Sequence, residues 1–277
     1  MPDVPHQIRV ATLNVYSPQN PDWDRRLALM SRTLPDLDAD IVALQEVPVD
    51  DGFATVSTLL GDGYQIHPFS NPSDDGVAGV LATRGTSRLI GELDQRVPGR
   101  SGSLPWAATL LVEVETAVGR VLAVHHKPSW QFPWELDREQ QALAAAVRIE
   151  EIADEYDHVV VLGDFDATPD AASMLFWRGR RSLDGRSVCY QDAWETAHPL
   201  DAGHTFVAAN PLVRAGEVRT AVDRRIDYVL VRAGIHGSSL LVSRCQRLYD
   251  APVDDVWASD HFGVVADLAD PGQDLVP

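Results

Sequence analysis

The stretch Val159-Val160-Val161-Leu162-Gly163-Asp164-Phe165-Asp166-Ala167-Thr168-Pro169-Asp170 decides the fold. Its first four residues are apolar and mostly β-branched, which is typical of a strand buried on both faces. A glycine ends the strand, and two carboxylates follow, Asp164 and Asp166. Alternate side chains of an extended backbone share a face, so we expect these carboxylates to lie about 7 Å apart at the carboxyl end of the strand. Thr168 and Pro169 are typical of a helix N-cap and first helical position, and they predict a helix there.

The two carboxylates have two interpretations. Negative charges at the end of one strand repel each other, and a divalent cation would relieve that repulsion. The alternative is an ordinary strand-to-helix turn, because aspartate suits turns for conformational reasons. This segment alone does not decide between them.

Other predicted strands also end or begin with polar side chains. They are residues 8–15 with Asn14, 40–47 with Glu46, 120–128 with His125, His126 and Lys127, 224–231 with Asp227, and 257–266 with Asp260 and His261 just before the closing strand. A glutamate at the end of a buried strand is costly to desolvate unless it is paired or binds a cation. By strand alternation, His125 is expected to point away from the face that carries His126.

The remaining pattern predicts one domain. Helical spacing covers residues 23–33, 53–60 and 136–156, further strands cover 76–83 and 107–114, and residues 84–105 read as a long loop. No linker or repeat divides the chain. We expect an N-terminal extension over 1–7, a single domain over 8–268 and a flexible acidic tail over 269–277.

Composition limits the function classes. The chain has 277 residues, and 41 acidic against 23 basic residues give a net charge of −18. Such a charge does not favour non-specific nucleic-acid binding, which depends on clustered Lys and Arg. Two distant cysteines without metal-ligand spacing predict free thiols. With no signal-like N-terminus and no run long enough to span a bilayer, we expect a cytoplasmic protein without a transmembrane segment.

Taken in order, the polar segments resemble those of the endonuclease/exonuclease/phosphatase superfamily, which includes deoxyribonuclease I, neutral sphingomyelinases and inositol polyphosphate 5-phosphatases. The resemblance covers roughly residues 8–268. It is carried by Thr12-Leu13-Asn14, Leu44-Gln45-Glu46-Val47, His126, Gly163-Asp164-Phe165-Asp166-Ala167, Arg225-Ile226-Asp227-Tyr228 and Ser259-Asp260-His261.

This resemblance implies an α+β fold, a four-layered α/β/β/α sandwich of two packed mixed β-sheets with outer helices. It also implies hydrolysis of a phosphoester that depends on Mg²⁺ or Mn²⁺. Hard cations prefer oxygen ligands, which fits the residue types. Glu46 is the first candidate ligand, with Asn14 and Asp260 beside it.

The resemblance also implies catalytic roles. Asp164 would position or deprotonate the attacking water, His261 would contact the scissile phosphate, and Asp227 would orient the His261 ring. His126 is a candidate for contact with the phosphate or leaving group. Asn14, Arg178 and Arg225 are candidate substrate-binding residues. Lys127 is another candidate, although it departs from the resemblance, because many relatives continue with a leucine after the histidine. The arginines near 176–181 have an alternative reading as a helix C-terminus.

Asp166 departs from the resemblance, because the family usually has asparagine there. A carboxylate cannot donate a hydrogen bond to phosphate unless it is protonated. The hypotheses are that Asp166 binds a second cation, has a raised pKa beside Asp164, or is offset by Lys127 or an arginine.

The sequence therefore predicts a metal-dependent phosphodiesterase or phosphatase that acts on a small or lipid-borne phosphoester. One alternative is an endo- or exonuclease with a narrow basic groove, built from Arg178, Arg180, Arg181, Arg224 and Arg225. The other is an inactive phosphate-binding module, which the complete set of charged positions argues against. Substrate identity, the number of metals and the oligomeric state stay open.

Overall fold

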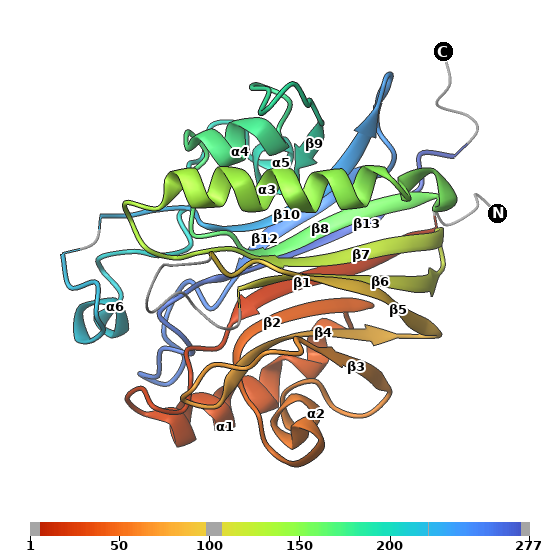
Figure 1. Ribbon diagram of the computed structural model, residues 1–277. Helices are drawn as coiled ribbons and strands as arrows, with labels where there is room; N and C mark the ends of the chain where they lie inside the picture. The colour runs from red at the N-terminus through yellow and green to blue at the C-terminus, as the bar shows by residue number, and fades with distance from the viewer. Residues whose placement is uncertain (1–5, 98–106, 221, 273–277) are drawn as a thin grey trace.

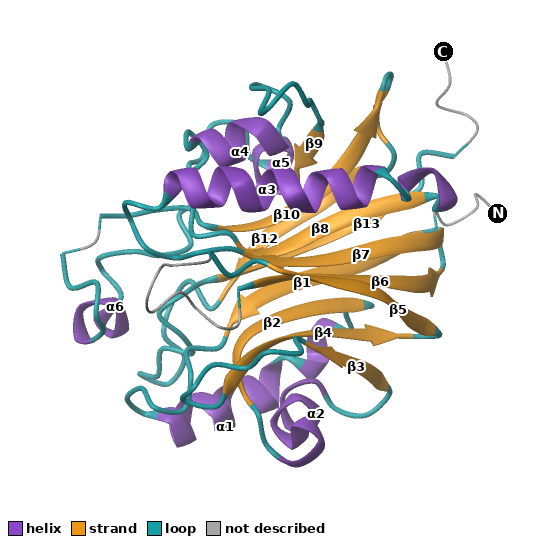
Figure 2. Cartoon of the chain, in the orientation of Figure 1, coloured by secondary structure: helices purple, strands orange, loops and turns teal. Residues whose placement is uncertain are grey.

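The computed structural model describes residues 6–97, 107–220 and 222–272. Two mixed β-sheets pack face to face, and helices cover their outer faces (Figures 1 and 2). In Figure 1, α3 (Glu135–Glu150) and α4 (Ala172–Trp177) lie above the sheets, and α1 (Trp23–Thr33) and α2 (Ala54–Leu60) lie below them. This is the predicted α+β sandwich of four layers.

The first sheet has six strands. Their order is β12 (Leu241–Leu248), β13 (Gly263–Ala269), β1 (Gln7–Asn14), β2 (Ile41–Pro48), β4 (Val77–Arg84) and β3 (Tyr64–Pro68). Only β1 and β2 pair in parallel, and the other neighbours are antiparallel.

The second sheet has seven strands. Six follow the order β11 (Gly237–Ser238), β10 (Asp227–Gly234), β8 (His158–Asp164), β7 (Gly119–Lys127), β6 (Ala108–Thr116) and β5 (Ser87–Asp94), and β9 (Tyr190–Asp192) pairs with β10. β7 and β8 form its parallel pair. The short helices α5 (Ala193–Ala197) and α6 (Pro211–Ala215) lie in the connection between β9 and β10.

Three buried apolar clusters between the layers explain the hydrophobic pattern of the strand sequences. Val160 and Leu162 of β8 face the other sheet, whereas Val159 and Val161 face the layer of α3 and α4. Both faces of β8 are therefore buried, which is why its sequence is continuously apolar. A third cluster fills the space between the first sheet and α1 and α2, with Met30 of α1 fully buried.

Some predicted boundaries were wrong. The predicted loop over 84–105 contains the strand β5, and its residues 98–105 lie outside the described part of the chain. Nearly all β5 side chains are exposed or half-exposed because it is an edge strand, so it lacks a buried apolar pattern. The predicted extension and tail include Gln7 and Ala269, which instead pair with each other as ends of β1 and β13. Residues 1–5 and 273–277 lie outside the described residues.

The helix predicted at Thr168 and Pro169 begins later. Thr168 accepts a hydrogen bond from the backbone N–H of Ala171 in a turn, and α4 starts at Ala172. Both cysteines are free, as predicted, with Cys189 exposed and Cys245 buried. Among the described residues, no helix combines the length and apolar character needed to cross a bilayer.

Candidate active site

Polar side chains from both sheets meet at one end of the sandwich. The strands of the parallel pairs β1–β2 and β7–β8 run in the same direction, so their carboxyl ends lie together at one end of each sheet. β10 is antiparallel to β8, with Asp227 directly opposite Asp164. Because β13 is antiparallel to β1, the loop before β13 brings Asp260 and His261 to the same end of the sandwich. A hydrogen bond of 3.3 Å from Asn14 to Asp164 joins the two sheets here.

Glu46 reaches the site because the backbone of β2 is irregular at this residue. Val42, Leu44 and Val47 pack into the core beside α1 and α2, so regular alternation would place Glu46 on that same face. A register shift between Leu44 and Val47, together with a φ of 59° at Glu46, turns the carboxylate towards Asn14. Bulges next to active sites commonly redirect a side chain in this way.

Asn14 connects two carboxylates. Its Nδ2 donates to Oε1 of Glu46 at 3.0 Å and to Oδ2 of Asp164 at 3.3 Å. Its Oδ1 accepts from the backbone N–H of Tyr16 at 2.9 Å, so the amide presents its NH₂ group to the site. This orientation differs from the predicted metal-ligand role of Asn14, which requires the oxygen. Its other predicted role, in binding substrate, stays a prediction.

Asp260 is a buried acid near Glu46. Burial, with the nearby charge of Glu46, raises the pKa of Asp260 to about 7, although His261 opposes this shift. The only hydrogen bond to its carboxylate among the described residues comes from the Ser259 hydroxyl, at 3.3 Å. Within the described residues, no lysine or arginine forms an ion pair with Asp260 or Glu46. The two carboxylates therefore suit a divalent cation, which binds one or two carboxylates and keeps waters.

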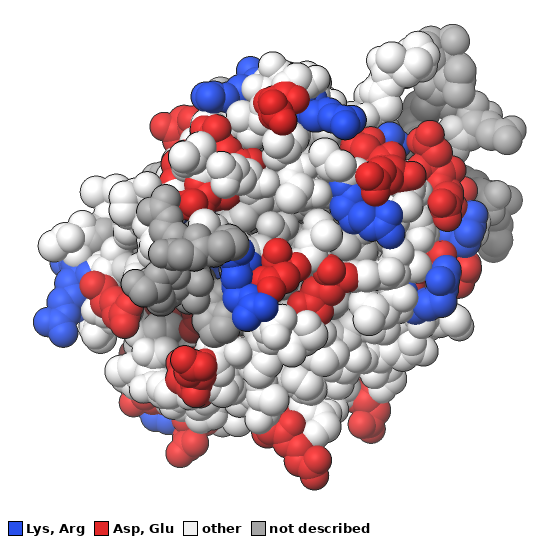
Figure 3. Space-filling model, viewed as in Figure 1, with Lys and Arg blue, Asp and Glu red and all other residues white. Residues whose placement is uncertain are grey.

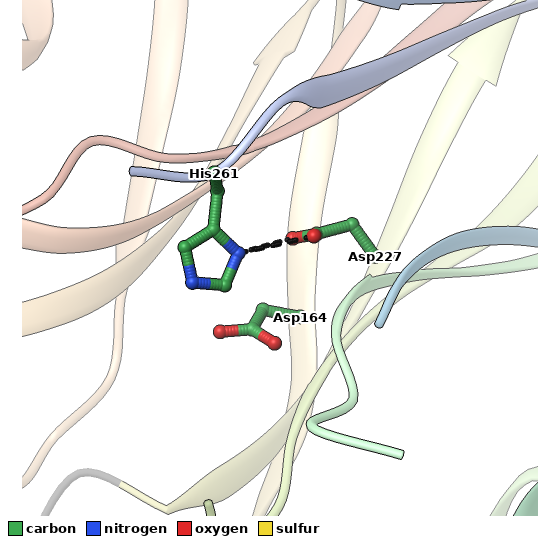
Figure 4. Close-up of side chains that lie close together, drawn as sticks. All are labelled: Asp164, Asp227 and His261. Carbon is green, nitrogen blue, oxygen red and sulfur yellow. Dashed lines mark hydrogen bonds and ion pairs between the residues drawn. The ribbon is translucent and has the colours of Figure 1, made fainter. Parts of the chain in front are cut away.

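His261 and Asp227 form a hydrogen-bonded pair. Nδ1 of His261 donates to Oδ2 of Asp227 at 3.0 Å, which leaves Nε2 to face other groups, as Figure 4 shows. Burial alone would lower the pKa of His261, but the carboxylates of Asp227 and Asp164 raise it well above its usual value. The two carboxylates therefore favour the protonated form of the His261 ring. Asp164, Asp227 and His261 offer ligand atoms within 4.8 Å of one another, but the Nδ1 hydrogen bond and the positive ring favour proton handling over metal binding.

Lys127 lies between Asp164 and Asp166. Its Nζ is 2.9 Å from Oδ2 of Asp164 and also pairs with Oδ2 of Asp166. Burial would raise the pKa of Asp164, but Lys127 and His261 lower it to about 2. Burial and the charge of Asp164 raise the pKa of Asp166 to about 6. The predicted extended geometry at Asp166 was wrong: its φ is 53°, and its N–H donates to Oδ1 of Asp164 at 3.2 Å.

The two histidines of β7 have exchanged their expected faces. Nδ1 of His126 contacts the Thr109 hydroxyl, and its ring packs on Phe165 and Trp177 beneath α4. Asp164 lies on the opposite, inter-sheet face, together with His125, which is 2.8 Å from the side-chain amide of Gln45. The structure therefore contradicts the predicted contact of His126 with phosphate. Burial lowers the pKa of His126 to about 3, so its ring is neutral.

Arg178 and Arg225 lie beside the site and line a cleft of about 760 Å³. The guanidinium of Arg178 pairs with Glu195 and donates to the carbonyl of Pro169. Arg225 is buried and pairs with Asp192 at 2.5 Å. Both side chains are thus held by this chain's own acids. Their predicted contact with substrate stays a prediction.

Sequence reasoning missed Arg26, which is fully buried. Its guanidinium donates to the carbonyls of Val15 and Ser17 after β1, and at 3.4 Å to that of Ala258 before β13. Arg26 thereby holds together the loops that carry Asn14 and Asp260. Its position in the apolar stripe of a helix was the available signal, since a buried arginine requires partners.

The chain matches the model of the Endonuclease/Exonuclease/phosphatase family over residues 11–261. This span contains every strand end that contributes to the site. The chain belongs to this family. It is therefore an enzyme that hydrolyses phosphoester bonds. No curated protein sequence matches the chain in a sequence search.

Several solved structures have the same fold as this chain. TDP2 from D. rerio, in complex with a single-strand DNA product, is 15% identical with a TM-score of 0.71, covering 95% of this chain and 98% of that one. A family protein from Bacteroides vulgatus is 22% identical with a TM-score of 0.67, covering 95% and 99%. ANGEL2, a 2′,3′-cyclic phosphatase, is 13% identical with a TM-score of 0.68, covering 95% of each chain. At these identities the similarity concerns the fold.

Proposed function

We propose that the protein is a Mg²⁺- or Mn²⁺-dependent phosphodiesterase or phosphatase that acts on a small or lipid-borne phosphoester. One observation carries the proposal. Asn14 links Glu46, a candidate metal ligand, to Asp164, which in turn faces the His261–Asp227 pair. A cation site, an acceptor for water and a proton donor are thus adjacent, as phosphoester hydrolysis requires.

Glu46 and Asp260 are the proposed metal ligands. Both are acids, they lie close enough to raise the pKa of Asp260, and the described residues provide neither with a lysine or arginine. A bound divalent ion supplies Lewis-acid polarisation of a phosphoryl oxygen. Asn14 keeps Glu46 in place and turns its NH₂ group towards the site.

Asp164 is the proposed acceptor for the attacking water. With its pKa lowered to about 2, it is ionised at neutral pH and accepts hydrogen bonds through both oxygens. Such a carboxylate is a weak base, so its main task is to orient the water towards phosphorus.

His261 is the proposed donor to the phosphate. Asp227 holds its Nδ1, so the protonated Nε2 can donate to a phosphoryl oxygen or to the leaving group. Asp227 is a positioning residue in this arrangement, because it fixes the orientation and charge of the imidazole.

The charge distribution favours a small or lipid-borne substrate over bulk nucleic acid. On the face in Figure 3, basic and acidic side chains are interspersed. Of the arginines predicted to form a groove, Arg178 and Arg180 pair with Glu195, and Arg225 pairs with Asp192. Cations already neutralised by acids contribute little to phosphate tracking. The nuclease alternative predicts instead an activity that falls steeply with salt.

A substrate panel with Mg²⁺, Mn²⁺ or a chelator tests the proposal. It should contain nucleic acids, phospholipids, and sugar and inositol phosphates, assayed for wild type, Asp164→Ala and His261→Gln. The matched control is Asp154→Ala, because the Asp154 side chain is 95% exposed and lies beyond the end of α3. We expect turnover of a small or lipid phosphoester that chelator and both site variants abolish. Turnover that persists in chelator contradicts the metal role, and preference for DNA with a steep salt dependence supports the nuclease.

We also propose that the protein works in the cytoplasm. The exposed thiol of Cys189 and the buried thiol of Cys245 are both unpaired. Free cysteines are typical of reducing compartments. Fractionation of native cells with an antibody against the protein tests this placement.

A further inference from the structure

We propose that Lys127 is a resident counter-cation, which occupies the position between Asp164 and Asp166 where a second divalent ion would otherwise bind. The protein would then use one catalytic metal, at Glu46 and Asp260. This inference rests on the proposed function and adds the number of metal ions.

The contacts of Lys127 are those of a bridging cation. Its Nζ lies 2.9 Å from Oδ2 of Asp164 and pairs with Oδ2 of Asp166. The side chain of Lys127 is 2% exposed, and those of Asp164 and Asp166 are 1% and 10% exposed. Burial of two carboxylates is unfavourable without a positive charge between them. Lys127 supplies that charge from within the chain.

The backbone is shaped to bring these three groups together. Gly163 has a φ of 151°, and a Cβ there would lie 2.2 Å from the carbonyl oxygen of His126, so only glycine permits this approach of β7 and β8. The left-handed backbone of Asp166 then turns its carboxylate back towards Lys127. Two conformations that disfavour ordinary side chains therefore serve the same ion pairs.

A comparison within the site separates the two acidic pairs. Glu46 and Asp260 have no ion pair with a lysine or arginine among the described residues, and Arg26 near them donates to backbone carbonyls. Asp164 and Asp166 share a lysine. The pair that needs an external cation is therefore the Glu46–Asp260 pair. The Lys127 bridge also explains why residue 166 is an aspartate, although the family that the sequence resembles usually has asparagine there.

Counting bound Mn²⁺ ions tests the proposal without an activity assay. Equilibrium dialysis against saturating MnCl₂, followed by metal analysis, gives the number of ions per folded chain. The variants are Lys127→Met, which removes the charge but keeps the length, and the double variant Lys127→Met/Asp166→Asn, which also removes one carboxylate. Circular dichroism and thermal unfolding establish that each variant is folded.

We expect one Mn²⁺ per chain for wild type, two for Lys127→Met and one for the double variant. Two ions in wild type overturn the proposal, and so does a single ion in folded Lys127→Met. If Lys127→Met does not fold, Glu46→Gln/Asp260→Asn decides, because it leaves Lys127 intact. We expect that variant to bind no Mn²⁺, and one retained ion at Asp164 and Asp166 overturns the proposal.

The same measurement separates this proposal from the proposed function. A wild-type protein that binds no Mn²⁺ or Mg²⁺ contradicts metal dependence itself. A wild-type protein that binds two ions and hydrolyses phosphoesters contradicts only the role of Lys127.

Discussion

Two pairs of acidic side chains lie in one site and are treated differently by the fold. The open pair, Glu46 and Asp260, forms no ion pair with a lysine or arginine among the described residues, and the pKa of Asp260 rises to about 7. The bridged pair, Asp164 and Asp166, encloses Lys127, and the pKa of Asp164 falls to about 2 while that of Asp166 rises to about 6. The difference between the two pairs shows that a cluster of carboxylates does not by itself indicate where a metal binds. The position of the nearest fixed cation decides which acids are left for it.

The largest effect is expected at the open pair. Glu46→Gln removes a charged ligand, so we expect kcat/KM to fall by about 10³-fold and the Mg²⁺ concentration for half-activity to rise. A Mg²⁺ titration of initial rates measures both quantities. Glu151→Gln is a suitable control, because the Glu151 side chain is 59% exposed after α3. Unchanged Mg²⁺ dependence in Glu46→Gln would place the metal elsewhere.

A smaller loss is expected at the histidine that faces the bridged pair. His261→Gln removes the cationic donor but leaves Lys127 beside Asp164, so we expect kcat to fall by about 10²-fold with little change in Mn²⁺ affinity. Steady-state kinetics and Mn²⁺ dialysis on the same preparation test this split. Loss of metal binding in His261→Gln would show that the imidazole is itself a ligand, as its closeness to Asp164 and Asp227 allows.

The uncompensated charge of Asp260 should also affect the free energy of unfolding of the metal-free protein. Its pKa is raised, so its carboxyl contributes stability that is fully present below the unfolded pKa of about 3.9 and is lost as pH rises through about 7. Asp260→Asn removes this loss. In chelator, we expect the variant to gain stability relative to wild type between pH 4 and 7, by at most about 1.4 kcal/mol per pH unit.

Urea unfolding of both proteins at pH 4, 5.5, 7 and 8 measures the difference. A gap between the two proteins that does not vary with pH would mean that a cation within the chain already compensates Asp260.

The sequence predicted the fold, and it named most of the side chains that meet at the candidate site, because these signals are local. The continuous apolar run of β8 and the acids after it require only the strand period and burial on two faces. It failed where backbone conformation departs from that period. Alternation gives no hint of the bulge that turns Glu46, or of the left-handed residue Asp166 that folds back on Lys127.

The error at His126 has a different cause. A pair of adjacent histidines always presents one ring to each face, and the choice between faces depends on which neighbours fill the two sides of β7. Phe165 and Trp177 hold His126 beneath α4, and these contacts span about 40 to 50 residues of chain. The same holds for Arg26, whose partners include Ala258 across 232 residues. A local hydrophobic pattern cannot predict contacts between residues this far apart in the sequence.

The smallest effect is expected at Asp166. Burial and Asp164 raise the pKa of Asp166 to about 6, so below that pH its carboxyl is largely protonated and resembles asparagine. Asp166→Asn should therefore match wild-type kcat/KM near pH 5. Above pH 6, wild type has an ionised Asp166 held by Lys127, and the variant lets Lys127 interact with Asp164 alone. We expect the two activities to separate there by less than about tenfold, because Asp164 keeps its cation in both proteins. Rate profiles from pH 5 to 8 at saturating Mg²⁺ measure the ratio. A loss of a hundredfold at every pH would mean that Asp166 itself binds the metal or substrate, and the two acidic pairs would then no longer differ in kind.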